Sequence, residues 1–258
     1  MTATLMRYDL PPPQERILEP PQRDSKLEEA LQQYHRFCTG AAKNHEVWDP
    51  EYTYFFARDR VTAVLNSLEI NLFLAEITRR SEHPLVKSYA VTALINNAYE
   101  TGIHSFDITI PDNLETQSFG EHLCGTKEQP YNLRITGNLG WSSFQKSKHV
   151  NVIVKGNCGR ATAVRAEYVS LECEDITRQL GVRASNSVFR FHHINYEFIS
   201  KGNPLSPGIL HQARCCKIQV YTQEDFELCK TLRIPERQGH KIQLAKEITH
   251  EVIQEVSV

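Results

Sequence analysis

The stretch ITGNLG at residues 135–140 is written again as VKGNCG at residues 154–159, nineteen residues further along the chain. Each copy ends a run in which apolar and polar residues alternate, as they do in a half-buried strand. Glycine and asparagine tolerate the positive φ that a sharp corner between strands requires. We therefore predict a short strand followed by a corner, with these structural corner residues: Gly137, Asn138, Gly140, Gly156, Asn157 and Gly159.

The alternating pattern continues beyond the two repeated words. A repeat of about 20 residues is typical of a solenoid, in which each coil buries its apolar face on the next. Further strand-like segments lie at 106–110, 218–220 and 232–234. We expect four apolar pairs to lie beside one another in a parallel stack, in this order: Leu133/Ile135, Val152/Val154, Val169/Leu171 and Phe189/Phe191.

The residues before the repeats have helical spacing. A capping box at Ser25 begins a predicted helix over 25–39. A second predicted helix begins at Pro50 and continues without further Gly or Pro to Arg80, and a third ends at Gly102. A polar loop over 112–130 is long enough to be either functional or poorly ordered. The predicted organisation is a Pro-rich arm (1–23), a helical region (24–102), a β-solenoid (103–240) and a C-terminal amphipathic helix (241–258). The predicted fold class is α+β: an N-terminal helical region followed by a short right-handed parallel β-solenoid with helical caps.

The recurring phrase I-x-G-N-x-G, with apolar alternation before it, resembles the glycine-rich right-handed β-helix known as the GXGXG domain. This domain occurs at the C-terminus of the glutamate synthase large subunit and in one of the subunits of formylmethanofuran dehydrogenase. The resemblance covers about residues 131–192. The family typically places a second glycine-rich corner in every coil, where this chain has FQKS at 144–147 and AVRA at 163–166. The resemblance implies an architectural part beside redox domains, and it supplies no catalytic residue.

Composition limits the class of protein. The chain has 258 residues, of which 40% are hydrophobic and 23% charged, as in an ordinary globular protein. No apolar run approaches the roughly 18–20 residues that span a bilayer, and the first residues lack the pattern of a secretory signal. Seven scattered cysteines favour reduced thiols over a disulfide framework. We therefore expect an intracellular, cytoplasmic protein that does not associate with membranes.

Positive charge is concentrated in the repeats. Residues 134–201 carry 10 Lys and Arg against 5 Asp and Glu, whereas residues 1–133 carry 12 against 19. A basic surface there could attract an anionic partner, face the acidic N-terminal region, or be solvated. Binding of nucleic acid or another polyanion would require an aromatic side chain and basic side chains on one exposed face. The candidates for that face are Trp141, Lys146, Lys148, Lys155, Arg160 and Arg165.

One group of thiols and an imidazole is a candidate for chemistry. His211, Cys215, Cys216 and Cys229 offer ligands for zinc or an activated cysteine. They lack paired C-x-x-C spacing, and isolated cysteines are commonly small core residues. The Gly-Asn words are not phosphate loops, because neither begins a predicted helix. We assign no catalytic residue, no metal site and no cofactor.

These observations favour a non-catalytic interaction or scaffold module, or an accessory subunit of an intracellular assembly, with a protein partner. The arm over 1–23 contains five prolines and offers Ile17 and Leu18 as an anchor for that partner. The first alternative is a Cys/His-dependent enzyme or enzyme subunit. The second is a protein that binds a polyanion or nucleic acid through a basic solenoid face.

Overall fold

A computed structural model of the chain describes residues 25–43, 49–176, 179–194, 210, 212–231 and 239–245. The predicted anchor residues Ile17 and Leu18, His211 of the thiol cluster and the strand expected at 232–234 lie outside these ranges. The helices are α1 (Ser25–Lys43), α2 (Pro50–Arg60), α3 (Ser67–Thr78), α4 (Pro84–Glu100) and α6 (Gln223–Thr231). The strands are β1 (Ser105–Thr109), β2 (Tyr131–Thr136), β3 (Lys148–Lys155), β4 (Glu167–Ile176), β5 (Val188–Ile194), β6 (Lys217–Val220) and β7 (Lys241–Leu244).

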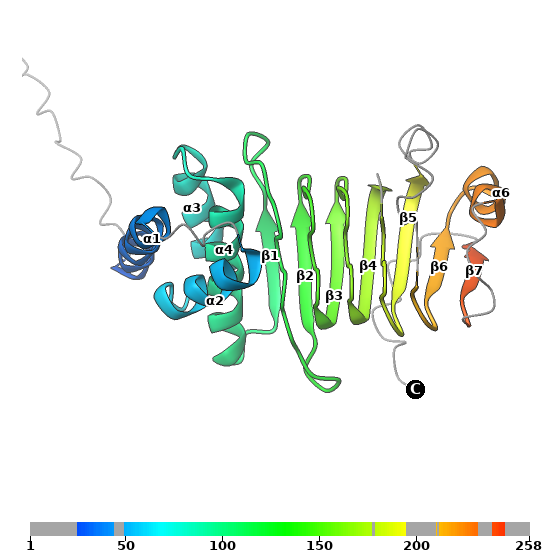
Figure 1. The fold of residues 1–258 in the computed structure, drawn as a ribbon, viewed down its shortest axis with the longest axis horizontal. Coiled ribbons are helices and arrows are strands. Elements are labelled where there is room, and N and C mark those ends of the chain that lie inside the picture. The colour runs from blue at the N-terminus through cyan, green and yellow to red at the C-terminus, as the bar shows by residue number, and fades with distance from the viewer. Residues whose placement is uncertain are drawn as a thin grey trace, which may run out of the picture.

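The described strands form one seven-stranded sheet, in which every strand runs parallel to its neighbours in the order of the chain. Helices α1 to α4 lie at the β1 end of this sheet, and α6 lies beside β6 and β7 at the other end (Figure 1). The fold class is therefore α+β, as the sequence predicts. No helix within the described ranges is both long and apolar enough to cross a lipid bilayer.

The register of the sheet follows the repeated words at first. Leu133 lies opposite Val152, and Ile135 lies opposite Val154, as predicted. The prediction for the next strand is wrong by two residues, because the partner of Val152 is Leu171 and not Val169. The prediction for the strand after that is wrong by two residues in the opposite direction, because the partner of Leu171 on β5 is Phe189 and not Phe191. A shift of two keeps every side chain on the same face of the sheet, so alternation alone could not distinguish the registers.

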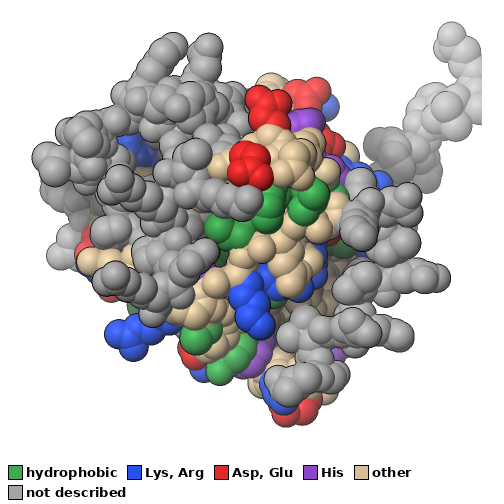
Figure 2. Space-filling view, turned by 90° about the vertical axis from the view of Figure 1, so that its right-hand side faces the viewer, with side chains coloured by type: hydrophobic (Ala, Val, Ile, Leu, Met, Phe, Trp, Pro, Cys, Tyr) green, Lys and Arg blue, Asp and Glu red, His purple; other side chains and the backbone are tan. Residues whose placement is uncertain are grey.

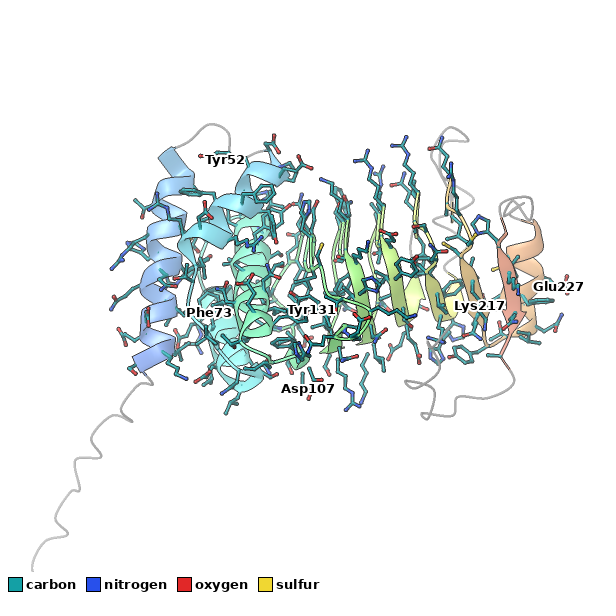
Figure 3. The ribbon with its side chains drawn as sticks, turned by 90° about the horizontal axis from the view of Figure 1, so that it is seen from below. Tyr52, Phe73, Asp107, Tyr131, Lys217 and Glu227 are labelled. Atoms are coloured by element: carbon teal, nitrogen blue, oxygen red, sulfur yellow. The ribbon has the colours of Figure 1, made fainter. Side chains whose placement is uncertain are left out.

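The helices and the sheet share one continuous core of buried apolar side chains. Tyr131 of β2 joins the two parts: its ring stacks on Tyr99 of α4, with 3.8 Å between the ring centroids. Its hydroxyl donates a hydrogen bond to Asn96 Oδ1, also on α4, at 2.5 Å. Figure 3 shows Tyr131 between the helices and the later strands. The first strands therefore lie against the helical region through packed aromatic rings.

The run predicted as one helix over 50–80 is two helices, because residues 61–66 are extended between α2 and α3. Asn66 begins α3 with a capping box to Glu69. Gln33 Oε1 accepts hydrogen bonds from the backbone N–H groups of Thr62 and Ala63 at 2.8 and 2.9 Å. The cap at Asn66 and the side-chain amide of Gln33 thus stabilise a break between the two helices, although no Gly or Pro marks it in the sequence.

The helix expected over 241–258 is contradicted at its start. Lys241–Leu244 is strand β7, paired with β6 so that Ile242 lies opposite Ile218, and residues 246–258 lie outside the described ranges. A four-residue segment with one inward apolar side chain fits a strand as well as a helix, and here pairing with β6 decides. Helix α6 is an element that the sequence pattern does not predict.

The two ends of the sheet differ in how they are covered. Figure 2 views the molecule from the β7 end, where hydrophobic side chains lie at the surface among polar ones, and Leu244 of β7 is 38% exposed. At the other end, α3 covers the outer edge of β1. Asn71 Nδ2 donates to the carbonyl of Asp107 at 3.0 Å, and Asn71 Oδ1 accepts from Thr109 N at 2.8 Å. Ser67 Oγ accepts from Asp107 N at 3.1 Å.

An unpaired strand edge is a template for pairing with another chain. Ser67 and Asn71 of α3 supply hydrogen bonds that a further strand beside β1 would otherwise make.

Candidate binding cleft

The segments that lead into β3, β4 and β5 have an unusual backbone. Alternate residues have positive φ between about 50° and 65°, and most of them are not glycine. Their N–H groups bond to neighbouring segments: Lys146 N donates to Val164 O at 2.9 Å, and Arg165 N donates to Val182 O at 2.8 Å. We call residues 141–146, 160–165 and 179–183 the connecting face. Its left-handed residues are Ser142, Phe144, Lys146, Ala161, Ala163, Arg165, Gln179, Gly181 and Arg183.

The corners after the strands behave as the repeated words predict. Gly137 and Gly156 have φ of 112° and 145°. A Cβ added to Gly156 would lie 2.5 Å from the carbonyl oxygen of Gly137, which no real side chain tolerates. Asn157 N donates to Asn138 Oδ1 at 2.9 Å, so the two Gly-Asn words stack directly on one another. The prediction of a positive φ at this corner is confirmed, and its cause is the contact between successive segments.

The connecting face carries a column of positive charge. The backbone bonds described above stack Lys146, Arg165 and Arg183 on successive segments, and neighbouring parallel strands lie about 4.8 Å apart. Arg165 is exposed, and its side chain has no hydrogen-bond or ion-pair partner among the described residues. Arg183 is also exposed, and its Nε donates to Gln212 Oε1 at 2.8 Å. We call these three residues the basic column.

A cleft of about 530 Å³ runs beside the basic column. One end is lined by Glu51 in the first turn of α2 and by Gln117, Ser118 and Glu121 of the loop before β2, and the remainder by the connecting segments as far as Arg183. The cleft is therefore bounded by α2 and this loop at one end and by three successive connecting segments along its length.

At the helical end of the cleft, a buried carboxylate is held in place. Tyr89 Oη donates to Glu121 Oε2 at 2.6 Å, and Lys146 Nζ lies 3.8 Å from Glu121 Oε1. Lys146 also bonds to Glu51 across the mouth of the cleft. Burial, with the charge of Glu121, raises the pKa of Tyr89, so the phenol stays protonated and keeps donating. The ammonium group of Lys146 thus lies close to two carboxylates, and its contact with Glu51 links α2 to the connecting face.

His122 lies next to this carboxylate. Its ring stacks on Tyr54 of α2 with 4.7 Å between centroids, and its Nε2 lies 3.6 Å from Glu121 Oε1. Burial lowers the pKa of His122 below its usual 6.5, with Lys146 acting in the same direction and Glu121 against it. The predicted loop over 112–130 is ordered, and it delivers both Glu121 and His122 to this region.

The structure divides the predicted basic candidates into two groups. Trp141, which is 61% exposed, and Arg160, whose Nε donates to Gln179 Oε1 at 3.1 Å, lie with Lys146 and Arg165 on the connecting face. Lys148 and Lys155 lie at opposite ends of β3, and Lys148 pairs with Glu167 at 3.1 Å. The set therefore does not form one surface.

Sequence reasoning missed three charged residues of the cleft, Glu51, Glu121 and Arg183. A signal for Arg183 exists, because Lys146, Arg165 and Arg183 follow one another at spacings of 19 and 18 residues, which the strands also follow. Glu121 has no comparable signal, since it lies in a loop outside the repeats.

Most of the cysteines that the structure describes lie in the core. Cys216 and Cys229 are buried, and burial raises both thiol pKa values, that of Cys229 to about 12. Cys215 is exposed. Cys158 and Cys173 are core residues of adjacent segments, and the hydrogen bond between them, followed by burial, raises the pKa of Cys173. Over the described ranges, no three His, Cys, Asp or Glu side chains converge as a metal site would require.

Comparison with known proteins finds no matching family model, no matching curated protein and no matching solved structure. The residues of the cleft and of the connecting face therefore carry the functional proposal.

Proposed function

We propose that the chain is a non-catalytic protein-interaction module: a short right-handed parallel β-solenoid whose connecting face binds a protein partner within a larger assembly. The observation that carries this proposal is the charge pattern of that face. Residues 141–146, 160–165 and 179–183 contain four basic residues and no acidic one. A surface of one sign that the fold itself leaves largely unneutralised favours an oppositely charged partner.

Parallel bridges outside the named strands support the solenoid. Leu139 pairs with Cys158, Cys158 with Ile176, and Glu167 with Ser185, so contact between successive segments continues past both ends of the strands. Connections between parallel strands are right-handed in about 98% of cases. Phe144 and Lys146 also adopt left-handed conformations at a corner of this solenoid.

Site-specific crosslinking in the native cell tests the function. A photoreactive amino acid at Arg165 reports on the connecting face, and the same group at Arg134, an exposed position on β2, is the matched control. We expect one stoichiometric adduct from position 165 and none from position 134. Absence of an adduct from both positions would contradict the proposed function.

The arm has a separate place in this proposal. Removing residues 1–23, which contain Ile17 and Leu18, should weaken the same adduct and leave the thermal unfolding temperature unchanged, because the arm has too few apolar residues to contribute to a core. A large fall in unfolding temperature would instead make the arm part of the fold.

A further inference from the structure

The molecule already shows how a carboxylate on a helix meets the basic column. Helix α2 places Glu51 in its first turn, where the carboxylate pairs with Lys146, the first residue of the column. Lys146 is also close to the buried Glu121, so its charge is balanced within the fold. Within the fold, the contact between Glu51 of α2 and the basic column therefore involves only Lys146, the first residue of the column.

The next two positions of the column have no carboxylate within the described part of the chain. Arg165 is exposed without a partner there, and Arg183 bonds only to the neutral amide of Gln212. Val164 and Val182 line the cleft beside them. Arginine offers planar paired donors that match a carboxylate. The uncovered part of the column thus combines two guanidinium groups with the partly exposed side chain of Val164 and the nearly fully buried side chain of Val182.

The spacing of the column matches a helix better than an extended peptide. Successive positions rise by about 4.8 Å. Residues at i and i+4 of a helix lie about 5–6 Å apart on one face, whereas side chains on one face of an extended strand repeat at about 6.6 Å. A helix laid along the stack can therefore place one carboxylate at each position without losing register over the length of the column.

We propose that the connecting face docks an acidic amphipathic α-helix of a partner protein, whose carboxylates at i and i+4 pair with Arg165 and Arg183 and whose apolar residues contact Val164 and Val182. The proposal rests on the proposed function and names the chemistry of its partner. The partner helix would lie along Arg165 and Arg183, the two positions of the column beyond the contact between α2 and Lys146.

The test uses a stapled, fluorescently labelled 14-residue helical peptide with Glu at i, i+4 and i+7 and Leu at i+1 and i+8. Binding to the full chain is measured by titration at low and physiological salt, and by NMR of the arginine Nε–Hε groups. Controls are the same peptide with Gln for each Glu, and a single-stranded oligothymidine. The variant is Arg165→Gln with Arg183→Gln, and its charge-matched control is Arg134→Gln with Lys155→Gln.

We expect the Glu peptide to bind and to weaken with salt, and the Gln peptide to bind at least tenfold more weakly. The column variant should lose at least tenfold in affinity while the control variant keeps it. Arg165→Glu alone should lose affinity with unchanged thermal unfolding, because that side chain is exposed and unpartnered in the described ranges.

Three results would overturn the proposal: equal losses in both double variants, equal binding of the Gln peptide, or tighter binding of oligothymidine through the same two arginines. A crosslinked partner together with a negative peptide result refutes the acidic helix alone, whereas absence of any adduct refutes the function.

Discussion

The backbone is left-handed on both sides of β3, but for different reasons. At the corner that follows β2 and β3, Gly137 and Gly156 occupy the positive φ positions, and the carbonyl of one corner lies where a Cβ of the next would be. In the segments that precede β3 and β4, residues such as Phe144, Ala163 and Arg165 adopt positive φ with their side chains intact. A left-handed conformation costs such residues about 1–2 kcal/mol each.

The difference lies in what compensates the cost. At the glycine corner hydrogen bonds also join the segments, as Gly137 N to Lys155 O does at 3.0 Å, but only the absence of a side chain leaves room for the backbones to approach. In the connecting segments, backbone bonds between neighbouring segments hold the strained residues, as Ala163 N to Ser143 O does at 2.8 Å. A left-handed conformation that requires the absence of a side chain can therefore be predicted from a glycine in the sequence. One that is held by hydrogen bonds between segments has no such marker residue.

The largest effect should come from filling the glycine corner. Gly156→Val places a β-branched side chain at φ 145° and against the carbonyl of Gly137, so we expect a loss of about 3 kcal/mol or more in unfolding free energy. Asn157→Gly, the adjacent control, creates no such clash and should cost less. Denaturant unfolding measures both variants, and equal midpoints would show that the corner is not the constraint.

The strand between the two kinds of corner should be the next most sensitive. Val154 is buried between Ile135 and Cys173. Val154→Ala should cost about 1–3 kcal/mol in unfolding free energy through lost burial and a cavity. Ile153→Ala, on the partly exposed face of the same strand, is the control. If both changes cost the same free energy, the assignment of the inner face would be wrong.

A pair of Ala→Gly changes tests the strained segments directly. Ala161 is left-handed at φ 63°, whereas Ala75 is exposed within helix α3. Glycine relieves the strain at 161 and should leave stability unchanged or raise it by up to about 1 kcal/mol. The same change at 75 should cost about 1 kcal/mol. Thermal and denaturant unfolding decide the signs, and a similar loss at both positions would mean that no strain is stored in the connecting segments.

The smallest effect concerns pH. Burial lowers the pKa of His122 in the folded state, so the unfolded chain takes up a proton more readily as the pH falls through about 6.5. Stability should therefore decrease from about pH 7.5 to about pH 5.5. His122→Gln should reduce the slope without abolishing it, because burial also lowers the pKa values of His149 and His240. A slope unchanged by His122→Gln would assign the pH dependence to other groups.

The sequence predicts the parts of the fold that leave a local trace. Alternation and the two Gly-Asn words predict the parallel order, the corners and the register of β2 against β3. The break before α3 depends instead on Gln33, nearly thirty residues away, and the register of β4 is ambiguous by two residues. Long-range hydrogen bonds and shifts that preserve the face of a strand leave no mark in the pattern of apolar residues.

The candidate site leaves a weaker trace than the fold. Trp141, Lys146 and Arg160 stand out in the sequence as basic or aromatic neighbours, whereas Glu121 is one of several polar residues in a long loop. Its role depends on Tyr89, which only folding brings within 2.6 Å of its carboxylate.

The hydrogen bonds from Ser67 and Asn71 to β1 set a limit on how copies of the chain can join. A fibre in which the sheet of one molecule pairs with the sheet of the next needs two unpaired strand edges on every molecule, one for each neighbour. Here one edge is occupied by the chain's own side chains. Each molecule can therefore join another through at most one sheet edge. Association by strand pairing would stop at two molecules.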